Sequence, residues 1–270
     1  MHESWNRSAN GGRNLLYRNV GGGRFEAVDA AALGMPQTHW TIAAVAGDLD
    51  RDGWPDLYLA SDFGPDDVYL NRPAGDGSRR FQRLQGRMFG SVGNDTYKGM
   101  NASLGDFDRN GWLDVHVSNV HMPLQAEGSL LWMLGPGEGG VPEFRDEATV
   151  RGALNEGRFG WGAAVGDLDL DGWLDMVQAN GMVDDTLDKA GDSCPDYWYV
   201  NEKIMRAPPE VHAYADLWGD IRGRCINPRD ADRVYLNRGD RRVQQFEDAS
   251  AALGFGPGVP SRGVLLADFD

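Results

Sequence analysis

The chain has 270 residues, of which 37 are glycine and 41 are Asp or Glu, and its formal net charge is −15. An acid-rich chain without a cluster of Lys and Arg is a poor candidate for binding nucleic acid, because phosphate contacts need a basic patch. The sequence also has no run of about eighteen apolar residues, which excludes a transmembrane helix.

Residues 1–13 form a lead-in that lacks the apolar core of a signal peptide. The first patterned segment follows, with Leu15-Leu-Tyr17-Arg-Asn19, three glycines and then Phe25. Two short apolar runs around a Gly or Asp turn predict a β-hairpin. The same pattern recurs at 68–81, 130–144 and 234–246. The asparagines after the tyrosine strand are expected to form turns: Asn19, Asn71 and Asn237.

A second motif, D-x-D-x-(D/N)-G-W-x-D, alternates with these hairpins. It occupies 48–56, 106–114 and 167–175, and a fourth copy begins at the C-terminus. Alternating carboxylates before a turn glycine suit Ca²⁺, which takes about six to eight oxygen ligands. The candidate ligands are Asp48, Asp50, Asp52, the Trp54 carbonyl and Asp56; Asp106, Asp108, Asn110, the Trp112 carbonyl and Asp114; Asp167, Asp169, Asp171, the Trp173 carbonyl and Asp175; and Asp268 and Asp270.

These loops differ from an EF-hand, which needs a bidentate Glu at position twelve and a helix on each side. Position twelve is instead Leu59, Val117 and Gln178. The flanks are short apolar runs that predict buried strands: 41–46, 57–60, 101–104, 115–118, 162–165 and 176–179. Each loop is therefore expected to join two antiparallel strands. With Asn110 in place of Asp, the second site should be the weakest, and acidic turns without a metal are the alternative reading.

One repeat consists of two hairpins, hence four strands, and successive loops start 58 and 61 residues apart. Four-stranded units at this period predict an all-β fold, a β-propeller with about three complete blades plus partial ones. A β-helix of nonapeptide repeats would need a period of about 9 residues. The predicted domain spans 14–270, with repeats at about 14–66, 67–127, 128–181 and 232–270.

An insertion at 182–231 separates the third and fourth repeats. It holds both cysteines, Cys194 and Cys225, which either form a disulfide or remain buried free thiols. It also holds an aromatic cluster that could form a ligand surface: Tyr197, Trp198, Tyr199, Tyr214 and Trp218.

The repeats G-D-x-D-x-D-G-W-x-D, preceded by small residues as in 159–166, resemble the FG-GAP/VCBS repeats of integrin-α-type propellers. The alternating L-Y-x-N and G-x-F-x-D units also resemble bacterial proteins that add an ASPIC/UnbV domain, and the animal cartilage acidic proteins. The resemblance covers nearly all of 14–270 except the insertion. It implies the propeller and its calcium loops but little about activity. With no ASPIC/UnbV segment and a loop cut at Asp270, we expect a fragment of a longer secreted protein.

The chain has no G-x-S-x-G, H-E-x-x-H, P-loop or haem-attachment motif, and its five histidines lack metal spacing. The carboxylates are too numerous to exclude a glycosidase pair. We expect a calcium-stabilised, non-catalytic binding or adhesion module for an extracellular protein or glycan. Its expected location is secreted, periplasmic or at the cell surface. The alternatives are an enzyme or enzyme-accessory domain, for example in polysaccharide processing, and a structural spacer. The three loop tryptophans are expected to pack between blades.

Overall fold

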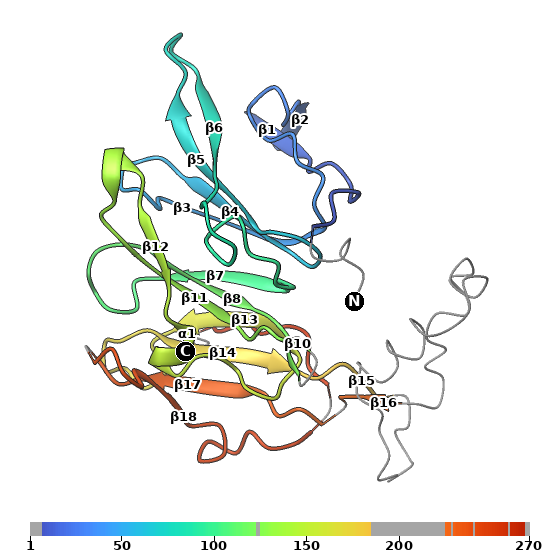
Figure 1. The fold of residues 1–270 in the computed structure, drawn as a ribbon, viewed down its shortest axis with the longest axis vertical. Helices are drawn as coiled ribbons and strands as arrows, with labels where there is room; N and C mark the ends of the chain where they lie inside the picture. Colours follow the sequence, from blue (N-terminus) through green and yellow to red (C-terminus); the bar gives the residue numbers. More distant parts are fainter. Residues whose placement is uncertain are drawn as a thin grey trace, which may run out of the picture. The chain divides into compact units, whose positions relative to one another are not determined.

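The computed structural model describes residues 7–122, 125–184, 225–227, 229–239, 241–258 and 260–267. The regular elements are mostly β-strands, as Figure 1 shows. The chain divides into two compact units. The first holds 2–117 and 130–147, and the second holds 118–129 and 148–270.

The first unit contains two four-stranded antiparallel sheets whose strands pair in chain order. One sheet is β3 (Thr41–Gly47), β4 (Asp56–Ser61), β5 (Asp67–Pro73) and β6 (Arg79–Leu84). The other is β7 (Asn101–Gly105), β8 (Asp114–Ser118), β11 (Leu130–Gly135) and β12 (Glu143–Asp146). The hairpin of β1 (Leu16–Gly21) and β2 (Arg24–Val28) forms a separate two-stranded sheet, and a 3₁₀ turn, η2, covers Glu138–Gly140.

The second unit contains the third four-stranded sheet. Its strands are β13 (Gly160–Gly166), β14 (Asp175–Asn180), β17 (Arg233–Asn237) and β18 (Phe246–Asp248). Two short pairs are β9 (His121–Met122) with β10 (Gln125–Ala126), and β15 (Val183–Asp184) with β16 (Cys225–Ile226). The short helix α1 covers Ala148–Arg151, and the insertion at 182–231 lies between β14 and β17.

The three sheets confirm the predicted all-β class and its four-stranded units, but each sheet begins at a different hairpin from the predicted sequence repeat. Each sheet begins with the hairpin that contains an acidic loop. It then adds the following hairpin whose first strand contains Tyr or Trp, which is called the tyrosine hairpin below, so the first sheet spans 41–84. The repeat predicted at about 14–66 instead starts with a tyrosine hairpin. The register explains the difference, because β4 pairs with β5 through Leu57 and Tyr69.

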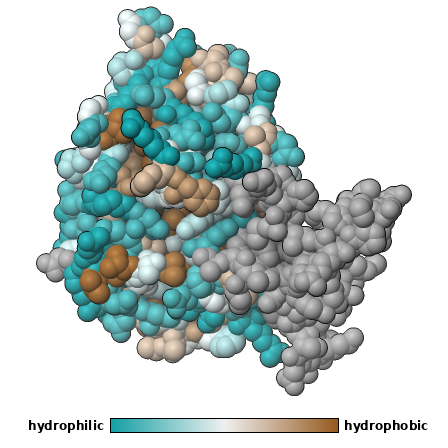
Figure 2. Space-filling view, in the orientation of Figure 1, coloured by the Kyte–Doolittle hydropathy of each residue, from teal (hydrophilic) through white to brown (hydrophobic). Residues whose placement is uncertain are grey.

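The core of the first unit consists of inner strands that are buried on both faces. Tyr58, Val68 and Val115 are fully buried, and Trp132 donates a hydrogen bond from Nε1 to the Tyr58 hydroxyl at 2.9 Å. The Tyr58 hydroxyl in turn donates to buried Asp66 at 2.6 Å, so both aromatic polar groups have partners, as buried Tyr and Trp require. Trp112 packs against the same cluster, while Figure 2 shows an outer face on which hydrophilic residues predominate.

The segment that follows β2 packs against the next sheet. The Leu33 carbonyl accepts the Phe81 amide of β6 at 2.7 Å. A Cβ at Gly34 would lie 2.0 Å from the Phe81 carbonyl oxygen, and Gly34 has a φ of +101°. Only glycine fits this approach.

In the described residues, no helix is long and apolar enough to cross a membrane.

Gly34→Ala is therefore expected to lower the free energy of unfolding by about 2–4 kcal/mol, because a left-handed backbone and a steric clash add up. The matched control is Gly254→Ala, at the same place in the later copy of the segment. Gly254 has a φ of +85° and open space around it, so only the backbone cost of about 1 kcal/mol is expected. Urea unfolding compares the two, and equal losses would contradict the packing argument.

Candidate metal centres

Each acidic loop joins the first two strands of its sheet. The loop 48–56 lies between β3 and β4, 106–114 between β7 and β8, and 167–175 between β13 and β14. Three aspartates in each loop bring carboxylate oxygens within 4.8 Å of one another: Asp48, Asp50 and Asp56; Asp106, Asp108 and Asp114; and Asp167, Asp169 and Asp175. Each of these three clusters could hold a metal ion.

The backbone of each loop folds around its first carboxylate. Asp48 accepts the Asp52 amide on Oδ1 at 3.0 Å and the Gly53 amide on Oδ2 at 2.9 Å. The glycine has positive φ in all three loops: 88° at Gly53, 84° at Gly111 and 89° at Gly172. The fourth position is also left-handed in all three: 61° at Arg51, 56° at Arg109 and 58° at Leu170. Three copies with one strained geometry indicate a specific loop conformation.

The ninth residue of each loop is a buried aspartate that connects the loop to the third strand of the sheet. Asp56 accepts the Leu49 amide from the loop at 2.8 Å and the Asn71 amide from β5 at 2.7 Å. The other loops repeat both bonds: Phe107 and Leu134 donate to Asp114 at 2.9 and 2.8 Å, and Leu168 and Asn237 donate to Asp175 at 2.7 Å each. The sequence pattern predicted a ligand here but not this second role.

Burial shapes the electrostatics of these ninth residues. It raises the pKa of Asp56 to about 6 and that of Asp114 to about 8, and it also raises the pKa of Asp175. The two amide bonds lower each pKa and the neighbouring loop carboxylates raise it further. A bound divalent cation would favour the ionised form of the same groups.

The fifth position lies outside the three carboxylate clusters. Asp52 accepts the Trp54 amide on Oδ1 at 2.9 Å, and Asn110 and Asp171 accept the amides of Trp112 and Trp173 at 2.7 and 2.8 Å. The tryptophans have different surroundings. Trp54 is half exposed under the Arg79 guanidinium, 4.2 Å from its ring, whereas Trp112 packs against the core.

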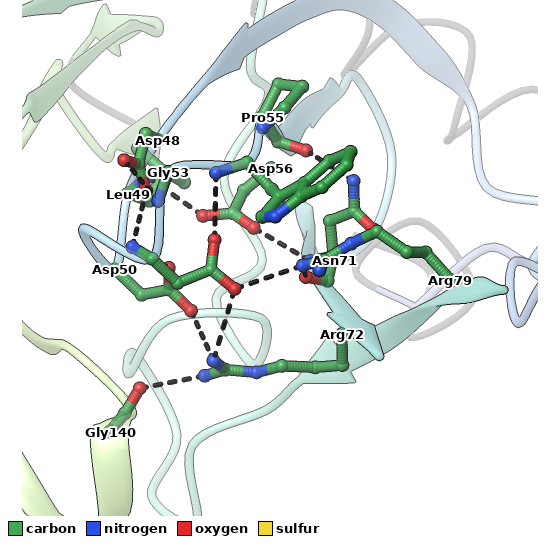
Figure 3. A network of polar contacts seen from close by, with 12 residues as sticks. Asp48, Leu49, Asp50, Gly53, Pro55, Asp56, Asn71, Arg72, Arg79 and Gly140 are labelled. Atoms are coloured by element: carbon green, nitrogen blue, oxygen red, sulfur yellow. Dashed lines mark hydrogen bonds and ion pairs between the residues drawn. The ribbon is translucent and has the colours of Figure 1, made fainter. Parts of the chain in front are cut away.

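Arginines from the tyrosine hairpins reach the first and third loops, which the sequence reasoning missed. Figure 3 shows Arg72 of β5 beside Asp50, with Nη1 at 2.6 Å from Oδ2, and Arg79 of β6 pairs with Asp52 at 3.0 Å. In the third sheet, Arg238 lies 3.4 Å from Asp169. The available signal was the arginine that follows the asparagine in both L-N-R segments.

The asparagines of these segments do more than form turns. Asn71 donates from Nδ2 to the Pro55 carbonyl at 3.1 Å, and Asn237 donates to the Leu174 carbonyl at 3.1 Å. Each therefore anchors the residue that precedes a ninth-position aspartate. Asn19 accepts the Gly21 amide at 2.9 Å, which is a local turn bond as expected.

The donor set of each loop fits calcium. The clustered oxygens all belong to carboxylates, which are hard ligands that favour Ca²⁺ or Mg²⁺ over softer transition metals. The first and third aspartates remain partly accessible and the ninth is buried, so the ninth aspartate anchors each cluster to its sheet.

Several predicted residues lie outside the described part of the chain: Asp268, Asp270, Cys194, Tyr197, Trp198, Tyr199, Tyr214 and Trp218. Cys225 lies in β16, where its backbone pairs with Asp184. The disulfide, the fourth loop and the aromatic ligand surface therefore stay predictions.

Comparison with known proteins agrees with this architecture. The family described as FG-GAP-like repeat matches residues 7–59 and 48–117. Cartilage acidic protein 1 from Mus musculus and from Homo sapiens are each 31% identical over 172 residues, which cover 63% of this chain and 25% of each relative. The chain spans about a quarter of the length of these curated relatives. The chain contains FG-GAP-like repeats within residues 7–117 and is distantly similar to cartilage acidic protein 1, and its four-stranded antiparallel sheets are consistent with FG-GAP β-propeller blades.

Proposed function

We propose that the chain is a calcium-stabilised propeller module that acts outside the cell by binding a protein or glycan, without catalysis. The observation that carries the calcium assignment is the convergence of three carboxylates in each loop with the same hydrogen bonds in all three copies. The repetition of this arrangement in three separate loops favours a common ligand over unrelated acidic turns.

Calcium would stabilise the sheets through the ninth aspartate. An ion held by Asp48, Asp50 and Asp56 relieves the repulsion among these carboxylates. Because Asp56 also accepts the Asn71 amide of β5, fixing the loop fixes the third strand as well. The role assigned to the ion is thus structural.

The extracellular location is supported by the chemistry of the loops and by the relatives. Calcium sites of extracellular modules work at about 10⁻⁴–10⁻³ M, a concentration found outside cells. The relatives carry the name cartilage acidic protein, which fits a protein of the extracellular matrix. A rigid scaffold that presents loops suits recognition of a partner.

The test is a thermal melt and a calcium titration of this chain. Millimolar calcium is expected to raise the Tm, because a ligand at about one to ten times its Kd adds about 0.4–1.4 kcal/mol per site. The control is the triple variant Asp48→Asn, Asp106→Asn, Asp167→Asn, which should lose most of this rise. A Tm that is the same with calcium and with chelator, together with no bound calcium in the titration, would reject the assignment.

A further inference from the structure

One position in the third strand differs between the three sheets. The registers Leu57–Tyr69, Val115–Trp132 and Met176–Tyr235 align the three sheets. Three residues beyond the aromatic partner lie Arg72 in β5, Gly135 in β11 and Arg238, directly after the end of β17. This is the position that faces the acidic loop in the first and third sheets.

Arg72 is a fixed charge rather than a free side chain. Its Nη1 lies 2.6 Å from Asp50 Oδ2, and its Nη2 donates to the Gly140 carbonyl at 2.8 Å, as seen in Figure 3. The second bond holds the guanidinium between the loop and the η2 turn. Arg79 adds a further positive charge beside Asp52.

Arg238 makes a weaker version of this contact. It lies 3.4 Å from Asp169 and 2.7 Å from Glu247 of β18, so its charge is shared between the loop and its own sheet. Its influence on the third loop should therefore be smaller than that of Arg72 on the first loop.

The second sheet differs from the others at one acidic and one basic position. It carries Asn110 where the others carry Asp52 and Asp171, and Gly135 takes the arginine position. The Asn110 amide instead donates to the Leu134 carbonyl at 2.9 Å. Arg145 of β12 pairs with Glu143 and Glu147.

We propose that Arg72 and Arg238 are built-in counter-ions that lower the calcium affinity of their loops and stabilise these loops when calcium is scarce. In the second sheet, Gly135 holds the position that Arg72 and Arg238 hold in the other two. Affinity in calcium loops follows the charge of the site, and a fixed positive charge a few ångströms from the ion opposes binding. This inference rests on the calcium binding proposed above.

The experiment is a calcium titration followed by NMR on chain labelled with ¹⁵N-glycine. Gly53, Gly111 and Gly172 each donate to the first aspartate of their own loop, at 2.9, 2.9 and 2.8 Å, so their amide signals report the three sites separately. Arg72→Gln should tighten calcium at the Gly53 site by about tenfold, since charge count sets the affinity of such loops. Arg238→Gln should tighten the Gly172 site less.

The converse variant is Gly135→Arg, which should weaken binding at the Gly111 site. A Cβ at Gly135 meets only Arg145 atoms, at 3.9 and 4.0 Å, which is ordinary van der Waals contact. The control for net charge is Arg18→Gln, on an exposed strand of the separate β1–β2 hairpin, which should move none of the three signals. In calcium-free buffer, Arg72→Gln should also lower the Tm more than Arg18→Gln.

The outcomes separate the two proposals. If the glycine signals of the parent chain do not respond to calcium, the calcium role and this inference both fail. If they respond but Arg72→Gln leaves the Gly53 site unchanged or weakens it, calcium binding stands and the counter-ion role is wrong. Because Arg238→Gln and Gly135→Arg probe the same rule in other sheets, a folding defect in one variant leaves the rule testable.

Discussion

Asp114→Ala is expected to lower the free energy of unfolding by about 2–5 kcal/mol, because each buried amide left without an acceptor costs about 1–3 kcal/mol. Asp114 is fully buried and accepts the amides of Phe107 and Leu134. Its loss would release the loop from β11 and remove a calcium ligand at the same time. Equilibrium unfolding in urea, with calcium and with chelator, measures the effect.

Two variants make this result specific. Asp114→Asn keeps one acceptor oxygen and should fall between the parent and the alanine variant. Asn110→Ala, in the exposed part of the same loop, loses its bonds to the Trp112 amide and to the Leu134 carbonyl and should cost only about 1–2 kcal/mol. If Asp114→Ala were as mild as Asn110→Ala in chelator, the tie between loop and third strand would contribute little to stability.

The second large effect is a dependence of stability on pH that calcium opposes. Burial raises the pKa of Asp114 from 3.8 to about 8 and that of Asp56 to about 6, so the folded chain prefers their protonated forms. Ionisation of these groups therefore destabilises the calcium-free fold as the pH rises from 3.8 through about 8. Calcium binds the ionised form, so protons compete with it at low pH.

The rise in Tm that calcium produces should thus be small near about pH 5 and largest near about pH 8. Melts at a series of pH values, with calcium-free and calcium-loaded samples, test this expectation. Asp114→Asn removes the ninth-position aspartate whose pKa is raised to about 8, so its calcium-free Tm should decline less between neutral and alkaline pH. A calcium effect that is independent of pH would show that these buried carboxylates are not the ones that meet the ion.

The strands and the acidic loops could be predicted because their signals are local. The run 41–46 became β3 (Thr41–Gly47), and 176–179 became β14 (Asp175–Asn180). Alternating Asp with a turn glycine is a short-range pattern, and all three loops place their first, third and ninth carboxylates together.

What the sequence could not reveal are the contacts between distant segments. The bond from Asn71 to Asp56 spans 15 residues and the bond from Asn237 to Asp175 spans 62, because the insertion intervenes in the third sheet. The pairing of Arg72 with Asp50 likewise depends on which hairpin closes which sheet. Which two hairpins share a sheet is set by the pairing of the second and third strands, and the spacing of the repeats does not determine this pairing.

The bond between Leu33 and Phe81 affects how the chain can be cut. Residues that follow one tyrosine hairpin cover the outer strand of the next sheet, and the same happens where Val150 accepts the Gln244 amide beside β18. A truncation placed at Thr41, the first residue of β3, would keep all four strands of that sheet and still uncover the edge of β6. Uncovered edges invite pairing with other chains. A fragment that keeps its sheet covered must therefore include residues before Thr41 and is longer than the four-stranded unit itself.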